Sequence, residues 1–83
     1  MPTIYKVPLV LTPQQEGGYT VTSPVLPELV TEGDNLEEVL NNVRDALQAA
    51  LELYEDLGKP FPANLRQDPL TNPIWFEYLV AER

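Results

Sequence analysis

The sequence contains neither cysteine nor histidine, and only five of its 83 residues are lysine or arginine. Without cysteine, the fold cannot rely on disulfides or on thiolate metal sites. Without histidine, it lacks the side chain that most often acts as a general base and as a transition-metal ligand. The one glycine pair lies in an expected hairpin turn, so no phosphate-binding loop precedes a helix. We therefore expect no enzyme activity, no catalytic residue, no metal site and no cofactor.

Long hydrophobic runs are also missing. The uncharged apolar stretches extend over only a few residues, far fewer than the roughly 20 needed to cross a bilayer. The N-terminus reaches Pro2 and Lys6 too early to contain the apolar core of a signal peptide. We expect a cytoplasmic, soluble protein that forms a single domain over residues 1–83, a length that supports one modest core.

Positive charge is scarce, and acidic residues outnumber basic ones by 13 to five, which gives a formal net charge of −8. Between Glu16 and Asp56 there are ten acidic residues and a single base, Arg44, a formal −9 for that stretch. Nucleic-acid binding depends on basic groups that displace counterions, so we expect no direct binding of DNA or RNA. Binding to an anionic membrane is disfavoured for the same reason. A basic protein would be attracted, although acidity also serves solubility.

The apolar pattern predicts the element order β-β-β-α-β. Alternation predicts a strand over residues 4–12, placed at a sheet edge or bulged because Pro8 cannot donate to a ladder. The Gly17-Gly18 turn leads to a return strand at residues 18–23, and residues 29–31 form a short third strand. The expected fold is an α+β domain in which one long helix packs on one face of an antiparallel sheet.

A long amphipathic helix is the clearest predicted element. Asp34 and Glu37 form a capping-box pattern at its start, and Gly58 is a candidate left-handed cap at its end. An apolar stripe centred on Leu47 is expected to cover the sheet. The stripe consists of Leu36, Val39, Leu40, Val43, Leu47, Ala50, Leu51 and Tyr54.

The domain divides into a core at residues 4–58, a proline-rich stretch at 59–73 and a last strand at 74–81. The proline-rich stretch is either an ordered excursion or a linker. The last strand is apolar on both faces. Its aromatic residues therefore pack in the core, lie in an interface with another molecule, or do one from each face. A lone domain would expose part of it, and we expect a homodimer or tetramer. The predicted oligomer interface comprises Trp75, Phe76, Tyr78 and Leu79.

Acidic residues follow one line on the outer face of the predicted helix, opposite the apolar stripe. Arg44 has no acid three or four residues away, so the stabilising ladder of opposite charges is missing. The line is either a solvated surface or a docking ridge for a basic protein. Two acids that precede the helix are added to this line. The predicted partner-binding residues are Glu28, Glu32, Glu38, Asp45, Glu52 and Asp56.

Two segments carry a family resemblance. Residues 17–27 read GGYTVTSPVLP and residues 30–40 read VTEGDNLEEVL. They resemble the N-terminal domain of HicB-like antitoxins, of the UPF0150 type, and the match extends over residues 4–62. The resemblance implies a partial ribonuclease H-like fold. It also implies a partner, a small basic HicA-like toxin that cleaves messenger RNA and is neutralised by protein contact.

The sequence departs from this family in two places. Residues 25–29 stand where the family often has an acidic-Leu-Pro-Gly-Cys stretch, so no role of that Gly-Cys pair is carried over. Complete HicB proteins usually append a DNA-binding segment, and we expect this short form to have no room for one. Ribonuclease H chemistry requires an acid on the first strand, and residues 4–12 contain none. The alternative to an antitoxin is a solitary HicB-like module that oligomerises or binds a small ligand without a toxin partner.

Overall fold

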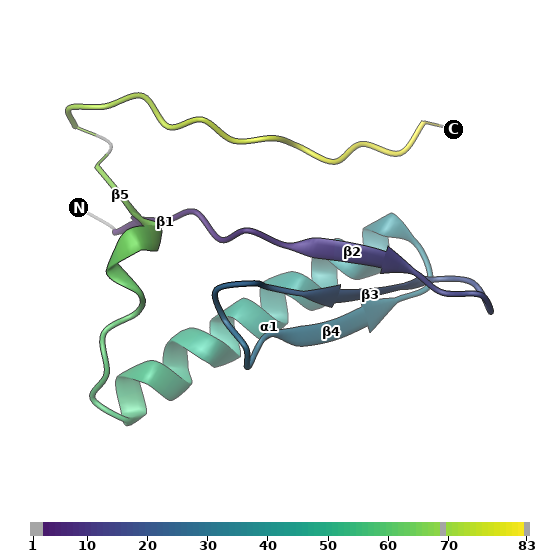
Figure 1. The fold of residues 1–83 in the computed structure, drawn as a ribbon, viewed down its shortest axis with the longest axis horizontal. Helices are drawn as coiled ribbons and strands as arrows, with labels where there is room; N and C mark the ends of the chain where they lie inside the picture. The colour runs from purple at the N-terminus through teal and green to yellow at the C-terminus, as the bar shows by residue number, and fades with distance from the viewer. Residues whose placement is uncertain (1–2, 69, 83) are drawn as a thin grey trace.

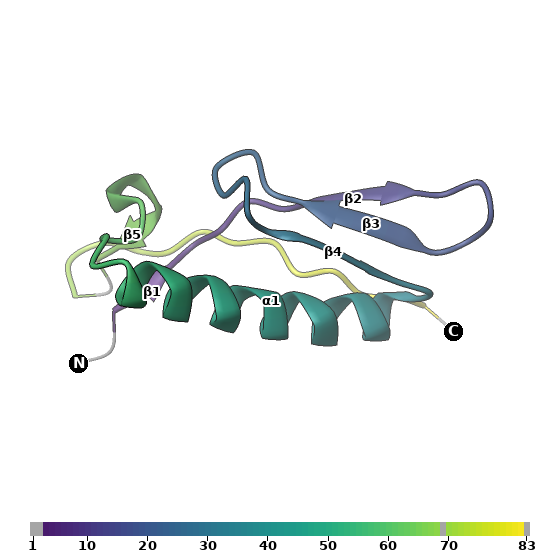
Figure 2. The same cartoon turned by 90° about the horizontal axis from the view of Figure 1, so that it is seen from below.

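A single long helix dominates the molecule. The computed structural model describes residues 3–68 and 70–82. Within them, α1 (Leu36–Asp56) lies across one face of a small antiparallel sheet, as two views at right angles show (Figures 1 and 2). The predicted α+β class, with its β-β-β-α-β order and one helix on one sheet face, is confirmed.

The sheet under α1 has three strands in the order β2-β3-β4. They are β2 (Val10–Pro13), β3 (Tyr19–Thr22) and β4 (Val30–Gly33). Leu11, Val21 and Thr31 are register partners across the three strands, so their side chains share one face. Val21 is fully buried, and this is the face that α1 covers.

The predicted first strand is divided in two. Its beginning, β1 (Ile4–Tyr5), pairs with β5 (Arg66–Gln67) rather than with the hairpin. Pro8 lies in the gap before β2, where its missing N–H interrupts the ladder. The prediction of an edge position is confirmed, because β2 is an outer strand of its sheet.

Glycines shape the junction between hairpin and helix. Gly17 and Gly18 both have positive φ, 99° and 77°, which confirms the predicted turn. A Cβ on Gly18 would lie 2.8 Å from the carbonyl oxygen of Gly33, and one on Gly33 would lie 2.7 Å from the backbone nitrogen of Val39. The turn, the end of β4 and the first turn of α1 are therefore in direct backbone contact.

The helix begins one residue later than predicted. Asn35, not Asp34, is the N-cap, and its side-chain oxygen accepts a hydrogen bond of 2.9 Å from the backbone N–H of Glu38. The capping box with Glu37 is therefore wrong, since an N-cap side chain bonds the N–H three residues on. Gly58 follows the helix with φ 66°, which confirms it as the left-handed cap.

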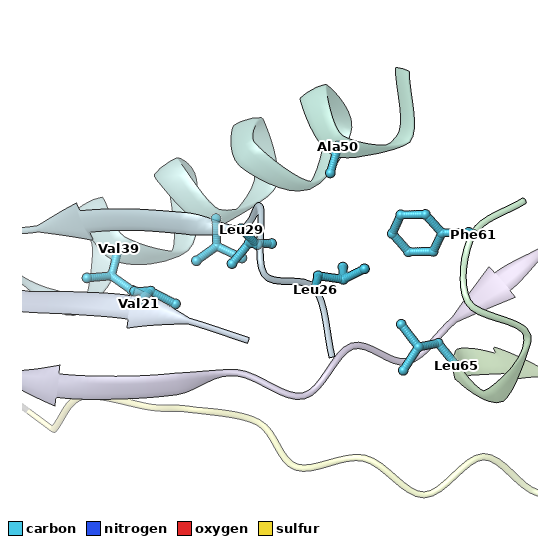
Figure 3. Close-up of a cluster of buried hydrophobic side chains, with 8 residues drawn as sticks. Val21, Leu26, Leu29, Val39, Ala50, Phe61 and Leu65 are labelled. Carbon is cyan, nitrogen blue, oxygen red and sulfur yellow. The ribbon is translucent and has the colours of Figure 1, made fainter. Parts of the chain in front are cut away.

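The hydrophobic core lies between α1, the sheet and the segments that flank both (Figure 3). The predicted stripe is wider than the buried one, because Leu40 and Leu51 remain 36% and 42% exposed and Leu47 is only partly buried. Three short strands do not offer enough surface to cover it. The buried core residues are Val21, Leu26, Leu29, Val39, Val43, Ala50, Phe61 and Leu65.

Residues 61–65 of the proline-rich stretch pack against the core. Phe61 is buried, and its ring makes edge-to-face contacts with Tyr5 and Tyr54 at centroid distances of 4.9 and 5.1 Å. Leu65, at the end of η1 (Ala63–Leu65), is buried beside it and its carbonyl accepts from the N–H of Lys6 at 2.8 Å. This stretch closes the end of the core that the sheet leaves open (Figure 3).

The predicted last strand is not a strand. Residues 74–81 run as an extended chain alongside β1 and β2, in the same direction as β2 (Figures 1 and 2). Within the described part of the chain they make no backbone–backbone hydrogen bond. Strand-like residues are not sufficient here, because a strand also requires a paired backbone.

Candidate protein-binding surfaces

The acidic residues predicted on the helix form one continuous line. Intervals of seven, seven and four residues bring them to nearly the same angle on α1 at about 100° per residue. All are exposed on the side of α1 that faces away from the sheet. We name this line, made of Glu38, Asp45, Glu52 and Asp56, the acidic ridge.

The other two predicted acids do not join the acidic ridge. Glu32 pairs with Thr20 on the sheet, and alternation from Thr31 places its side chain on the face opposite α1. Glu28 lies in the loop before β4, near the C-terminal part of the helix. The six predicted residues thus occupy three separate places.

Glu28 has a partner of its own. A hydrogen bond from the Tyr54 hydroxyl lowers the pKa of Glu28, and the nearby charge of Lys59 acts in the same direction. The same hydrogen bond raises the pKa of Tyr54. The two side chains therefore lie within reach of each other, which places Glu28 beside the C-terminal half of α1.

The C-terminal end of α1 adds no positive charge to the acidic ridge. No basic residue lies in the last turn of α1, where a cation would interact favourably with the helix dipole. Arg44, the one base on the helix, bonds to the amide oxygen of Asn41 at 3.5 Å rather than to a carboxylate. The charge of the ridge is therefore available to an outside partner.

The predicted oligomer residues form a second surface. Trp75 and Phe76 are 81% and 72% exposed, and Tyr78, Leu79 and Val80 are also exposed. Among the residues that the structure describes, one side-chain hydrogen bond ties this segment to the body of the molecule: Lys6 Nζ donates to the carbonyl oxygen of Trp75. The structure gives these side chains no place in its own core.

A groove separates this segment from the first strands. One wall contains Val7, Leu9 and Leu11, and the opposite wall contains Phe76 and Leu79. Val7, Leu9 and Leu11 are half-buried, because they also pack against the hydrophobic core. The sole sequence signal for the groove was Pro8, which interrupts the strand at this point.

No other site emerges from the described residues. Among residues 3–68 and 70–82, no three acidic, cysteine or histidine side chains are arranged to hold a metal ion. No helix in this part of the chain is long and apolar enough to cross a membrane.

Comparisons with known proteins identify the family. The chain is 44% identical over 71 residues to Antitoxin HicB 1 of Photorhabdus laumondii, and 36% identical over 73 residues to Antitoxin HicB of Escherichia coli K12. It is 30% identical over 57 residues to the UPF0150 protein Ta0767 of Thermoplasma acidophilum, of which it covers 83%. The chain belongs to the HicB-like antitoxin family. Family models and solved structures give no match.

The similarity covers only part of the longer HicB-like proteins. The matches take in 83% of this chain but only 46% and 53% of the two HicB antitoxins, so the chain spans about half their length. The UPF0150 protein is matched over most of its own length.

Proposed function

We propose that this chain is an antitoxin-type module that neutralises a small, basic, mRNA-cleaving toxin of the HicA-like kind by protein–protein contact. The observation that carries the proposal is its similarity to a protein named Antitoxin HicB 1 over most of the chain. No enzymatic step is part of it. The module acts in the cytoplasm, without a cofactor, and needs no direct contact with nucleic acid or membrane.

The acidic ridge supports this proposal because it offers a long, unneutralised surface to a cationic partner. The first and last of the four carboxylates are 18 positions apart on one helix, which is about 27 Å at 1.5 Å per residue. Opposite charges on two surfaces accelerate their encounter, and salt screens the effect over about 8 Å at physiological ionic strength. Association with the toxin should therefore slow as salt rises, while dissociation changes less.

Charge reversal tests the role of the ridge. Changing Glu38, Asp45 and Glu52 to Lys raises the formal charge from −8 to −2, because each change adds two. We expect a lower association rate with the toxin, measured by surface plasmon resonance or stopped flow. The matched control reverses Glu16, Glu77 and Glu82, which changes the net charge equally at positions outside α1. Equal effects of the two triple variants would show that only net charge matters.

Rescue of growth tests the function itself. The reading frame beside the gene should encode a short basic protein whose expression stops growth. Co-expression with this chain should restore growth, and the two proteins should purify together. Failure of both rescue and co-purification would refute the toxin partner.

A second function has its own support. The match covers 83% of the UPF0150 protein, so the family includes a chain of similar size to this one, and a solitary module that oligomerises or binds a small ligand is the second candidate. The genomic neighbourhood separates the two functions. A short basic reading frame beside the gene favours the antitoxin, and an isolated gene favours the solitary module.

A further inference from the structure

The C-terminal half of α1 carries exposed apolar side chains that the fold does not bury. Leu53 and Leu57 are 45% and 59% exposed, and Ala49 is exposed as well. Positions 49, 53 and 57 follow one another at intervals of four residues, so their side chains form one row along the helix. None of the three belongs to the buried core. We name this row the helix-end patch.

The helix-end patch lies on the flank of α1 that borders β4. Asn42 lies seven residues before Ala49 and is therefore on the same side of the helix. Its side chain donates a hydrogen bond of 2.6 Å to the carbonyl oxygen of Glu32 on β4. The groove described above lies beyond β2, at the other edge of the sheet (Figure 1). The helix-end patch is therefore separate from the groove and from the residues that line it.

The acidic ridge runs directly beside the helix-end patch. Asp45 and Glu52 lie four residues before and three residues after Ala49, and residues at these spacings are neighbours on a helix surface. Asp56 lies three residues after Leu53 in the same way. No basic residue lies in the last turn of α1, and the negative end of the helix dipole adds to the charge there. The exposed apolar side chains thus lie against a strip of negative charge.

We propose that the helix-end patch is the apolar anchor for the basic toxin, and that the toxin places there an apolar side chain flanked by lysine or arginine. The inference rests on the proposed antitoxin function and names the contacts that keep the complex together. A partner with this chemistry covers the two leucines with its apolar group and places its cations beside the acidic ridge. An apolar centre with a charged rim is the usual composition of a protein interface.

Charge selects a basic protein over other occupants of this helix face. A second copy would bring its own acidic ridge to the contact, and like charges that face each other oppose association. Nucleic acids and anionic membranes are repelled for the same reason. The ridge and the helix-end patch are expected to affect different rates. Charge acts before contact and speeds the encounter, whereas apolar packing exists only in the complex and slows dissociation.

Two pairs of leucines on α1 test the anchor. Leu53→Gln combined with Leu57→Gln removes the apolar surface without changing the net charge. The complex with the basic protein encoded beside the gene should then dissociate at least about tenfold faster. The control combines Leu40→Gln with Leu51→Gln, two leucines of comparable exposure on the other flank of α1, and should leave the dissociation rate nearly unchanged. Surface plasmon resonance measures the rates, and helix circular dichroism verifies that both variants fold.

Fluorescence provides a second readout that does not depend on the loss of a contact. Because the chain contains no cysteine, Leu57→Cys and Leu51→Cys each carry a polarity-sensitive dye at a single position. Addition of the basic protein should shift the dye emission to the blue at position 57 and not at position 51.

The outcomes separate this inference from the function on which it rests. Absence of any complex with the unaltered chain overturns both the antitoxin function and the anchor. A complex that dissociates from the Leu53 and Leu57 double variant at the original rate overturns the anchor alone. So does a complex that shifts the dye emission at position 57 no more than at position 51.

Discussion

Val39 and Val80 are identical side chains in two regions of the molecule that differ in what lies beside them. Val39 is completely buried between the helix and the sheet, whereas Val80 is largely exposed on an unpaired chain. The helix and the hairpin each satisfy their own backbone hydrogen bonds, and they cover each other's apolar surface within one copy. Residues 74–81, the apolar tail, have the same residue types but no paired strand among the described residues. Hydrophobicity alone therefore does not decide burial, because a backbone partner must be available as well.

The two phenylalanines provide the strongest test of this contrast. Phe61→Ala removes a buried ring with two aromatic neighbours and should cost about 3–5 kcal/mol of unfolding free energy. Phe76→Ala should cost under about 0.5 kcal/mol in the single copy, because its ring is exposed. Urea denaturation followed by helix circular dichroism at about 1 µM protein measures both. Similar costs would mean that the apolar tail packs in the single copy.

Substitution of the N-cap of α1 should have an intermediate effect on the free energy of unfolding. Asn35→Ala removes the oxygen that caps the N–H of Glu38 and should cost about 0.5–2 kcal/mol. Asp34→Ala, one residue earlier, should cost less than about 0.5 kcal/mol. The same denaturation experiment compares them. A larger loss in the Asp34 variant would restore Asp34 as the cap.

The smallest expected effect concerns the pair that joins the loop to the helix. The Tyr54 hydroxyl lowers the pKa of Glu28 from its reference of 4.5, so ionised Glu28 is favoured in the folded state. This stabilisation is present above pH 4.5 and is lost as the pH falls through the lower pKa of the folded protein. Tyr54→Phe should therefore be less stable than the original chain near neutral pH, with the difference shrinking in acid.

Urea midpoints measured over a range of pH provide the readout for this pair. Tyr78→Phe is the matched control, since Tyr78 is exposed on the apolar tail and has no such partner contact among the described residues. A difference between Tyr54→Phe and the original chain that stays constant with pH would show that the ring environment, not the hydrogen bond, is responsible.

The elements predicted correctly are those specified by local residues. The Gly17-Gly18 turn, the alternating hairpin, the amphipathic helix and the Gly58 cap each depend on neighbours within a few positions, and all are present. The regular spacing of the acidic ridge follows from helical periodicity in the same way. These features need no knowledge of how distant segments meet.

The elements predicted wrongly depend on distant partners. Residues 74–81 have strand composition but no backbone partner, and the first strand divides because β5, more than 60 residues away, pairs with its beginning. The predicted apolar stripe is wider than the buried one, because the helix sequence does not indicate how many strands lie beneath the helix. The candidate site shows the same limit. Helical spacing was sufficient to place the acidic residues of α1 on one line. Only the fold shows that Glu32 lies on the other face of the sheet.

The close approach of Gly18 and Gly33 has a consequence for how the family motifs are used. Gly18 belongs to the first segment that resembles HicB-like antitoxins, and Gly33 belongs to the second. In space they meet: a Cβ on Gly18 would collide with the carbonyl oxygen of Gly33, and a Cβ on Gly33 would collide with Val39 at the start of α1. The two segments are therefore a single motif folded back on itself. A search that requires both glycines, 15 positions apart, detects a three-dimensional junction, whereas either segment alone detects only a turn.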